Sequence, residues 1–248
     1  MQVLSELGIV KGKGGNTFDP TGYVTRAEMA KMIAYICQGG TVSKEVEETG
    51  LTDIRGHWAE THISYCYTQG ILSGRGGGLF APDDNVTAAE AAKMLLTALG
   101  YRGDYTGPAW ALTVIRDAQL AHIFDDVDVT SDEPVDRENA AQMIYNALLA
   151  ENAAEDTGLS LLEKNFGLQS WVGPYAGGLL PEDITFADRQ EIRVIYKDGE
   201  DGTAGQLDPS DTVTAPIPTA HEQFPADARA PGAGVRLIFI ISIRYDSL

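Results

Sequence analysis

The chain has 248 residues, of which 44% are hydrophobic and 22% charged, and its formal net charge is −18 at pH 7. So acidic a surface repels nucleic acid and anionic membranes, and we expect neither as a partner. No apolar run approaches the roughly 20 residues that a membrane-spanning helix needs, so we expect no membrane insertion. The residues after Met1 have neither the basic segment nor the cleavage site of a signal peptide.

An internal repeat organises the first part of the chain. A shift of 62 residues aligns residues 8–32 with residues 70–94, and 14 of the 25 aligned positions are identical. A fainter third copy follows at residues 110–143, where Trp110 aligns with Trp58. Repetition of this kind indicates one supersecondary unit that is stacked against its own copies.

The repeats predict four parts. These are a first repeat that lacks its front (1–49), a second repeat (50–104), a degenerate third repeat (105–152) and a region of different character (153–248). Each repeat is predicted to contain a helix, a glycine-rich loop and a second helix. In the middle copy the helices span about 58–69 and 87–99, with Gly70 ending the first one.

The start of the second helix carries an arginine that its own helix does not need. Thr25 and Glu28 form a capping box, which places Arg26 at the first helical position. The helix dipole disfavours a cation there by a few tenths to about 1 kcal/mol. The aligned residue is Ala88 in the second repeat and Arg137 in the third, so an arginine stands in two of the three copies.

The stretch "LTDIRGHWAETHISYCYTQGILSGRGGGLFAPDDNVTAAEAAKML" resembles an S-layer homology repeat. The shared features are an aspartate near the start, His-Trp-Ala, a Gly-Ile helix end, a Phe-x-Pro step and the capped second helix, which reads Thr-Arg-Ala-Glu in the first copy. The resemblance covers about residues 1–150 as three copies. It implies a non-catalytic module on the bacterial cell surface or cell wall, typical of Gram-positive bacteria, that binds secondary cell-wall polysaccharide. It also implies a pseudo-threefold all-α bundle with ligand grooves between repeats.

This resemblance suggests a reason for the arginines. A helix N-terminus offers N–H groups to an anion, and a guanidinium beside it fits a carboxylate such as a pyruvate ketal on an amino sugar. Arg26 and Arg137 are therefore candidate ligands of the polysaccharide. The alternative for Arg26 is an ion pair with Asp19 or another surface acid, and capping alone explains Thr25 and Glu28.

The remaining candidate residues lie before or at the start of the first helix of a repeat. Trp58 and Trp110 are expected to pack on the core or to border a sugar groove. Asp53 and His57 flank Trp58, and they are candidate groove residues as well. With Arg26, Arg137, Thr25 and Glu28 they complete the predicted polysaccharide site.

No catalytic or metal-binding pattern is visible, so we expect no enzyme activity, metal or cofactor. The acidic stretch "DDVDVTSDEPVDRE" fails the EF-hand pattern, because Ser131 and Arg137 occupy the positions of its glycine and its last glutamate. The four histidines lack zinc-ligand spacing. Cys37 and Cys66 align with leucines of other repeats, which predicts two buried structural thiols.

The last hundred residues predict a small, mostly β region, which makes the whole chain α+β. A short helix is expected at 159–168, and strands at 191–202 and 235–245. So apolar a strand near the end of the sequence suggests a missing partner strand, which self-association would supply. Two alternatives to wall binding remain open: a structural assembly module of a surface layer whose grooves have decayed, and a secreted enzyme whose catalytic domain lies outside this sequence.

Overall fold

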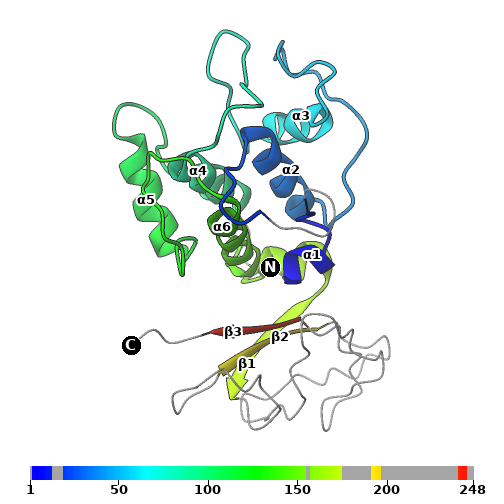
Figure 1. The fold of residues 1–248 in the computed structure, drawn as a ribbon, viewed down its shortest axis with the longest axis vertical. Coiled ribbons are helices and arrows are strands. Elements are labelled where there is room, and N and C mark those ends of the chain that lie inside the picture. The colour runs from blue at the N-terminus through cyan, green and yellow to red at the C-terminus, as the bar shows by residue number, and fades with distance from the viewer. Residues whose placement is uncertain (1, 13–18, 155–156, 175–190, 197–239, 245–248) are drawn as a thin grey trace. The chain divides into compact units, whose positions relative to one another are not determined.

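The computed structural model describes residues 2–12, 19–154, 157–174, 191–196 and 240–244 (Figure 1). The chain divides into two compact units, Met1–Phe166 and Gly167–Leu248. The described elements of the first unit are all helices, and those of the second are strands. The predicted all-α N-terminal region is therefore confirmed.

Seven helices are described in the first unit: α1 (Gln2–Glu6), α2 (Arg26–Cys37), α3 (Glu60–Thr68), α4 (Ala88–Ala98), α5 (Trp110–Leu120), α6 (Arg137–Leu149) and α7 (Leu161–Phe166). The two helices of the middle repeat, α3 and α4, lie inside the predicted spans. None of the helices in the described ranges is long and apolar enough to cross a membrane.

The helices pack in a closed order around α2, α4 and α6, each of which contacts the other two (Figure 1). The first helix of each repeat packs on the second helix of the preceding one: α3 on α2, α5 on α4, and α1 on α6. The third repeat thus contacts the first. Between them lie fully buried side chains such as Met29, Leu95 and Ile144, each of which contributes roughly 1.5–3 kcal/mol by leaving water.

A ring of backbone hydrogen bonds joins residues that lie just before α2, α4 and α6, which are called the inner helices from here on. The N–H of Val24 donates to the carbonyl of Val135 over 3.0 Å, and Val135 donates to Val86 over 3.0 Å. Val86 closes the ring by donating to Val24 over 2.9 Å. All three valines are buried, so the ring is shielded from water.

Local sequence signals explain the ends of these helices. Thr25 and Thr87 cap α2 and α4 in complete capping boxes, as predicted. Asp136 caps α6 alone, because Asn139 stands where the other copies have glutamate. In the glycine-rich loop of the second repeat, Gly76, Gly77 and Gly78 have φ between +63° and +91°, a region that residues with a Cβ rarely enter.

The described part of the second unit is a three-stranded antiparallel sheet in the order β1-β2-β3. Its strands are β1 (Gln169–Pro174), β2 (Glu191–Tyr196) and β3 (Ile240–Arg244), and Val194 pairs with Trp171 on one side and Ile241 on the other. Strands therefore occur at both predicted places. Most of residues 175–239 lies outside the described residues, so the predicted mostly-β character and self-association stay predictions.

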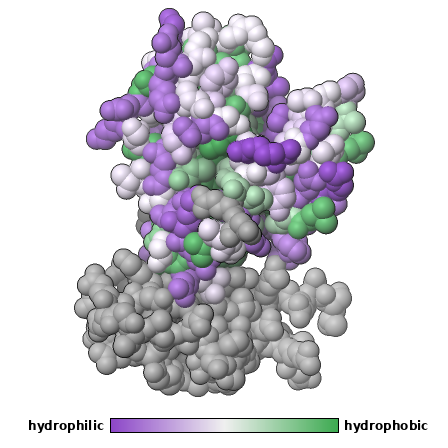
Figure 2. Space-filling view, turned by 180° about the vertical axis from the view of Figure 1, so that it is seen from behind, coloured by the Kyte–Doolittle hydropathy of each residue, from purple (hydrophilic) through white to green (hydrophobic). Residues whose placement is uncertain are grey.

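On the face seen in Figure 2, hydrophilic and intermediate residues of the helical unit are interspersed with small hydrophobic patches. Among the exposed large apolar side chains are Trp58, Leu112 and Leu120. Cys66 is buried, as predicted, whereas Cys37 is only partly buried, because it is the last residue of α2. Burial raises the pKa of Cys37 to about 12.

Candidate functional site

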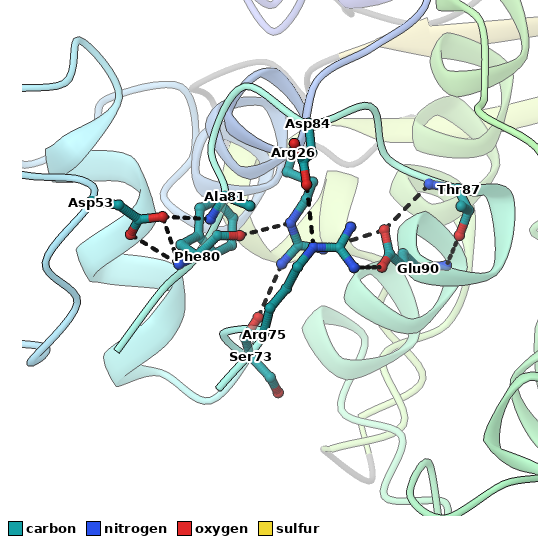
Figure 3. Close-up of polar contacts among 9 residues, drawn as sticks. All are labelled: Arg26, Asp53, Ser73, Arg75, Phe80, Ala81, Asp84, Thr87 and Glu90. Carbon is teal, nitrogen blue, oxygen red and sulfur yellow. Dashed lines mark hydrogen bonds and ion pairs between the residues drawn. The ribbon is translucent and has the colours of Figure 1, made fainter. Parts of the chain in front are cut away.

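Arg26 lies at the junction between the first and second repeats (Figure 3), and the residue is only 3% exposed. Its Nε donates to the carbonyl of Phe80 over 2.9 Å, and its Nη2 donates to the carbonyl of Ser73 over 3.1 Å. Nη1 lies 3.3 Å from Oε2 of Glu90. The guanidinium also stacks on the Phe80 ring, 4.5 Å from its centroid. Arg26 is therefore held on every side by the second repeat.

The N–H groups at the start of α2 are also occupied. Arg26 donates its backbone N–H to the carbonyl of Asp84 over 2.9 Å, and Ala27 donates to Pro82 over 2.9 Å. Glu28 donates to the hydroxyl of its cap, Thr25. The open helix terminus that motivated the predicted carboxylate contact is thus filled by the loop of the next repeat. Contact between Arg26 and a ligand stays a prediction.

Arg137 repeats this arrangement at the junction between the third and first repeats. Its Nη1 lies 3.2 Å from Oε1 of Glu28, and its Nη2 donates to the carbonyl of Lys11 over 3.3 Å. Glu28 and Lys11 are the residues of the first repeat that align with Glu90 and Ser73. Arg26 and Arg137 are called the arginine clamps from here on, since each joins its helix to the next repeat.

The junction between the second and third repeats has lost both partners. Ala88, which is fully buried, stands in place of the arginine. Asn139 stands in place of the glutamate, and its Oδ1 accepts from the N–H of Asp128 instead. The backbone bonds persist, since Ala88 donates to Glu133 over 3.1 Å and Ala89 to Ser131 over 2.9 Å.

Arg75 adds a more accessible guanidinium at the first junction (Figure 3). It extends from the glycine-rich loop, with Nη1 3.2 Å from Oε1 of Glu90 and Nε 3.5 Å from Oδ2 of Asp84. Glu90 thus lies between two arginines. Burial lowers the pKa of Arg26, and Arg75 adds to that effect while Glu90 opposes it. Two cations face two carboxylates here, so the junction is balanced rather than strongly cationic.

Asp53, His57 and Trp58 lie together at the front of the second repeat. The carboxylate of Asp53 accepts from the N–H groups of Phe80 and Ala81 at 2.7–3.0 Å, and so shapes the loop that receives Arg26 (Figure 3). His57 lies 3.3 Å from Asp83 through Nε2, and its ring lies against that of Trp58 with centroids 5.3 Å apart. Trp58 is 54% exposed, so one indole surface is open to solvent.

Trp110 differs from Trp58, although the two residues align. It begins α5, is only partly exposed, and has the ammonium of Lys93 5.4 Å from its ring centroid. That ammonium also donates to the carbonyl of Tyr105 over 3.0 Å. Among the described residues, no cluster of His, Cys, Asp or Glu is arranged to hold a metal ion.

The family model of the S-layer homology domain matches residues 1–30 and 50–92. These two stretches match S-layer homology repeats. Its third repeat lies outside that match, in keeping with its altered junction. The match covers the two helix starts with complete capping boxes and the loop that receives Arg26.

Several relatives are bacterial surface proteins. An S-layer protein of Bacillus licheniformis is 34% identical over 37% of this chain and 10% of its own length. An endoglucanase of a Bacillus species is 33% identical over 40% of this chain and 10% of its own length. A cellulosome-anchoring protein of Acetivibrio thermocellus is 27% identical over 46% of this chain and 26% of its own length. The match to the S-layer homology domain and the S-layer relative indicate a cell-surface location.

The chain spans only about a tenth to a quarter of the length of these relatives. Endoglucanase activity is therefore a property of that relative alone.

Sequence reasoning missed Arg75 and Glu90 as members of the junction. A signal for Glu90 was present in the repeats: the third copy keeps an arginine but not the box glutamate, and the second keeps the glutamate but not the arginine. If the arginine of each repeat is paired with the box glutamate of the next repeat, every arginine has a glutamate and every glutamate has an arginine. Within a single repeat that correlation cannot be seen.

Proposed function

We propose that the helical unit anchors the protein non-covalently to the bacterial cell wall by binding secondary cell-wall polysaccharide at the junctions between repeats. The observation that carries the proposal is the match of the first two repeats to the S-layer homology domain. The similarity to a cellulosome-anchoring protein supports an anchoring role. In this proposal the unit binds and does not catalyse.

The proposal includes a pseudo-threefold arrangement of the three helix-loop-helix repeats. Its support is the closed ring of Val24, Val86 and Val135 and the packing of α1 on α6. The arginine clamps support it as well, because each reaches the equivalent residues of the next repeat. A ring of this kind gives three junctions, two with a clamp and one without.

Within the first junction, the residues have different roles in polymer binding. Arg26, Asp53, Thr25 and Glu28 fix the shape of the junctions. The exposed indole of Trp58 offers an apolar face to a sugar ring, and aromatic faces also attract polar C–H edges. Arg75 offers a partly exposed guanidinium suited to a carboxylate substituent such as a pyruvate ketal. His57 supports Trp58.

At the junction between the third and first repeats, Arg137 fixes the shape. Trp110 borders the junction between the second and third repeats.

Co-sedimentation with purified cell-wall sacculi tests this proposal. Wild-type protein is expected to bind sacculi and to lose binding after the polysaccharide has been extracted. Trp58→Ala is expected to weaken binding at least fivefold, about 1 kcal/mol. Leu112→Ala is the matched control, since Leu112 is 72% exposed on α5. Binding that survives extraction of the polymer would refute the proposal.

A second candidate function is an assembly module of a surface layer. The observation that favours it is the loss of both clamp residues at the junction of Ala88 and Asn139. In that case the chain would not bind sacculi and would form concentration-dependent assemblies in analytical ultracentrifugation. A monomer that binds sacculi would exclude it.

A further inference from the structure

The segment that follows α6 turns back over the carboxyl ends of the inner helices. Its described residues are 151–154 and 157–166, which end with α7, and they are called the latch from here on. α7 contacts both α2 and α6, so the latch returns from the third repeat to the first. The match to the S-layer homology domain ends at residue 92, so the latch lies outside the matched residues.

Hydrogen bonds fasten the latch to the ends of two inner helices. The last carbonyl groups of a helix have no partner within the helix itself. The side-chain amide of Asn165 donates to the carbonyl of Ile36, in the last turn of α2, over 2.8 Å. The N–H of Ala153 donates to the carbonyl of Leu99, the C-cap of α4, over 2.8 Å. The latch thus connects the inner helices at the ends that lie away from the arginine clamps.

Apolar packing and a local cap hold α7 in place. Leu161 is 2% exposed, and Leu162 is fully buried. The hydroxyl of Ser160 accepts from the N–H of Glu163 over 3.2 Å, and the carboxylate of Glu163 accepts from the N–H of Ser160 over 2.8 Å. A helix as short as α7 is not stable in water on its own. It therefore depends on these contacts with the rest of the helical unit.

The close approach of the latch to α2 requires a glycine. Gly39 follows the C-cap of α2 with φ +62°, and a Cβ added there would overlap the carbonyl oxygen of Asn165. Gly70 follows the C-cap of α3 in the same way with φ +69°, but a Cβ added there would meet nothing within 4 Å. Alanine strains the backbone at both positions. Only at Gly39 does it also displace the latch, so the two glycines form a matched pair.

The latch lies where force from the second unit enters the helical unit. The chain passes from α7 into the second unit at Gly167. A pull on the second unit therefore acts on α7 before it reaches α6. Without the latch, the same pull would act on the end of α6 alone. The third repeat would then be pulled from the second at the junction of Ala88 and Asn139, which has no clamp.

We infer that the latch is a load-sharing device, which distributes a pull on the second unit over all three inner helices and so keeps the junction without a clamp closed. Contacts that bear a load together must break together, whereas contacts loaded one after another break singly. The inference rests on the proposed function, because an anchored protein is held at its helical unit while the rest of the chain is pulled.

Single-molecule force spectroscopy of the full chain at constant force tests the inference. One handle is attached to a tag after Leu248, and the other to Arg55→Cys, an exposed position close to Trp58 in the second repeat. Burial raises the pKa of both native thiols, so a maleimide handle reacts first at residue 55. Gly39→Ala is expected to shorten the lifetime of the folded helical unit roughly tenfold or more relative to Gly70→Ala, because forced unfolding follows the unfolding rate. Equal lifetimes of the two variants would overturn the inference.

A second pulling geometry separates load sharing from a general loss of stability. With the C-terminal handle moved to Glu151→Cys, an exposed position before α7, the load no longer enters through α7. The lifetimes of Gly39→Ala and Gly70→Ala should then agree within about threefold. The same large difference in both geometries would overturn the inference, since Gly39→Ala would then weaken the fold irrespective of the path of the load.

Two further measurements guard against misfolding and against failure of the proposed function. Asn165→Ala removes the bond to Ile36 without adding a clash, and it is expected to shorten the lifetime under C-terminal pull while the lifetime under pull at residue 151 stays near that of wild type. An unchanged lifetime under C-terminal pull would count against the latch. Sedimentation with sacculi applies no such load, so wild type that fails to bind them would overturn the proposed function, while the lifetimes decide the latch.

Discussion

The arginine clamps show why a cation occupies a helix start that disfavours it. Arg26 gives up a few tenths to about 1 kcal/mol to the helix dipole. It gains an ion pair with Glu90 and hydrogen bonds to the carbonyls of Ser73 and Phe80. Charge-assisted hydrogen bonds contribute about 1.5–3 kcal/mol each when formed, so the gain outweighs the cost. The main role of the Arg26 clamp is therefore to connect neighbouring repeats.

Removing one clamp is therefore expected to lower stability. Arg26→Gln removes one of the two arginines that pair with Glu90 and takes the donors away from the carbonyl groups of Ser73 and Phe80. The free energy of unfolding should therefore fall by roughly 2–4 kcal/mol. Urea denaturation measures this change. The matched control, Arg55→Gln, removes an exposed arginine and should stay within about 0.5 kcal/mol of wild type. A small effect of Arg26→Gln would mean that the clamp does not stabilise the joint.

The residue types at the helix starts could be predicted from the sequence, but their partners could not. Capping is local, so Thr25 and Glu28 identify themselves within four residues. The partner of Arg26 is 64 residues further along the chain, at Glu90, and depends on the order in which repeats contact one another. The predicted carboxylate contact assumed open N–H groups, and these groups instead bind Asp84 and Pro82.

At the scale of elements, each inner helix is fixed at its start by its own cap and by the next repeat. In α4 the hydroxyl of Thr87 accepts from the N–H of Glu90, and the carboxylate of Glu90 accepts from the N–H of Thr87. That same carboxylate pairs with Arg26. The cap and the joint are therefore one structure, and the helix start cannot move without disturbing the junction.

Removal of the cap in α4 tests this coupling. Thr87→Ala is expected to lower the free energy of unfolding by about 1 kcal/mol, or up to about 2 because Glu90 loses its orientation toward Arg26. Thr87→Ser keeps the hydroxyl and should recover most of the loss. Thermal unfolding followed by circular dichroism measures both variants. Equal losses of unfolding free energy for Thr87→Ala and Thr87→Ser would show that the hydroxyl does not stabilise the helix start.

The strands of the second unit could be placed from their pattern, but the sequence did not fix how they pair. Alternation at 191–196 and the apolar run near 240 predicted two strands, and β2 pairs with β3. The third strand, β1, was not predicted, because its two apolar residues, Trp171 and Val172, are followed by Gly173 and Pro174. Glycine and proline together are typical of a turn or loop rather than of a strand.

At the scale of the whole molecule, the three junctions of the ring are unequal. Those of Arg26 and Arg137 combine a clamp with backbone bonds, whereas that of Ala88 has backbone bonds without a clamp. Local opening occurs where the fewest interactions must break. The junction between the second and third repeats is therefore expected to open first.

Hydrogen exchange measured by NMR tests that order. The amides of Ala88 and Ala89 bond to the third repeat, and those of Arg26 and Ala27 bond to the second in the same way. The alanine pair should exchange roughly tenfold faster, which corresponds to about 1.4 kcal/mol less free energy of opening. Equal or slower exchange at Ala88 and Ala89 would show that the clamps do not set the stability of the joints.

Calorimetric titration of the full chain with polymer released from sacculi tests directly whether the helical unit binds wall polysaccharide. We expect saturable binding that weakens as salt is raised, because charged contacts between exposed groups are screened. We also expect weaker binding by Trp58→Ala than by Leu112→Ala. The absence of saturable binding to the released polymer would contradict the proposed function.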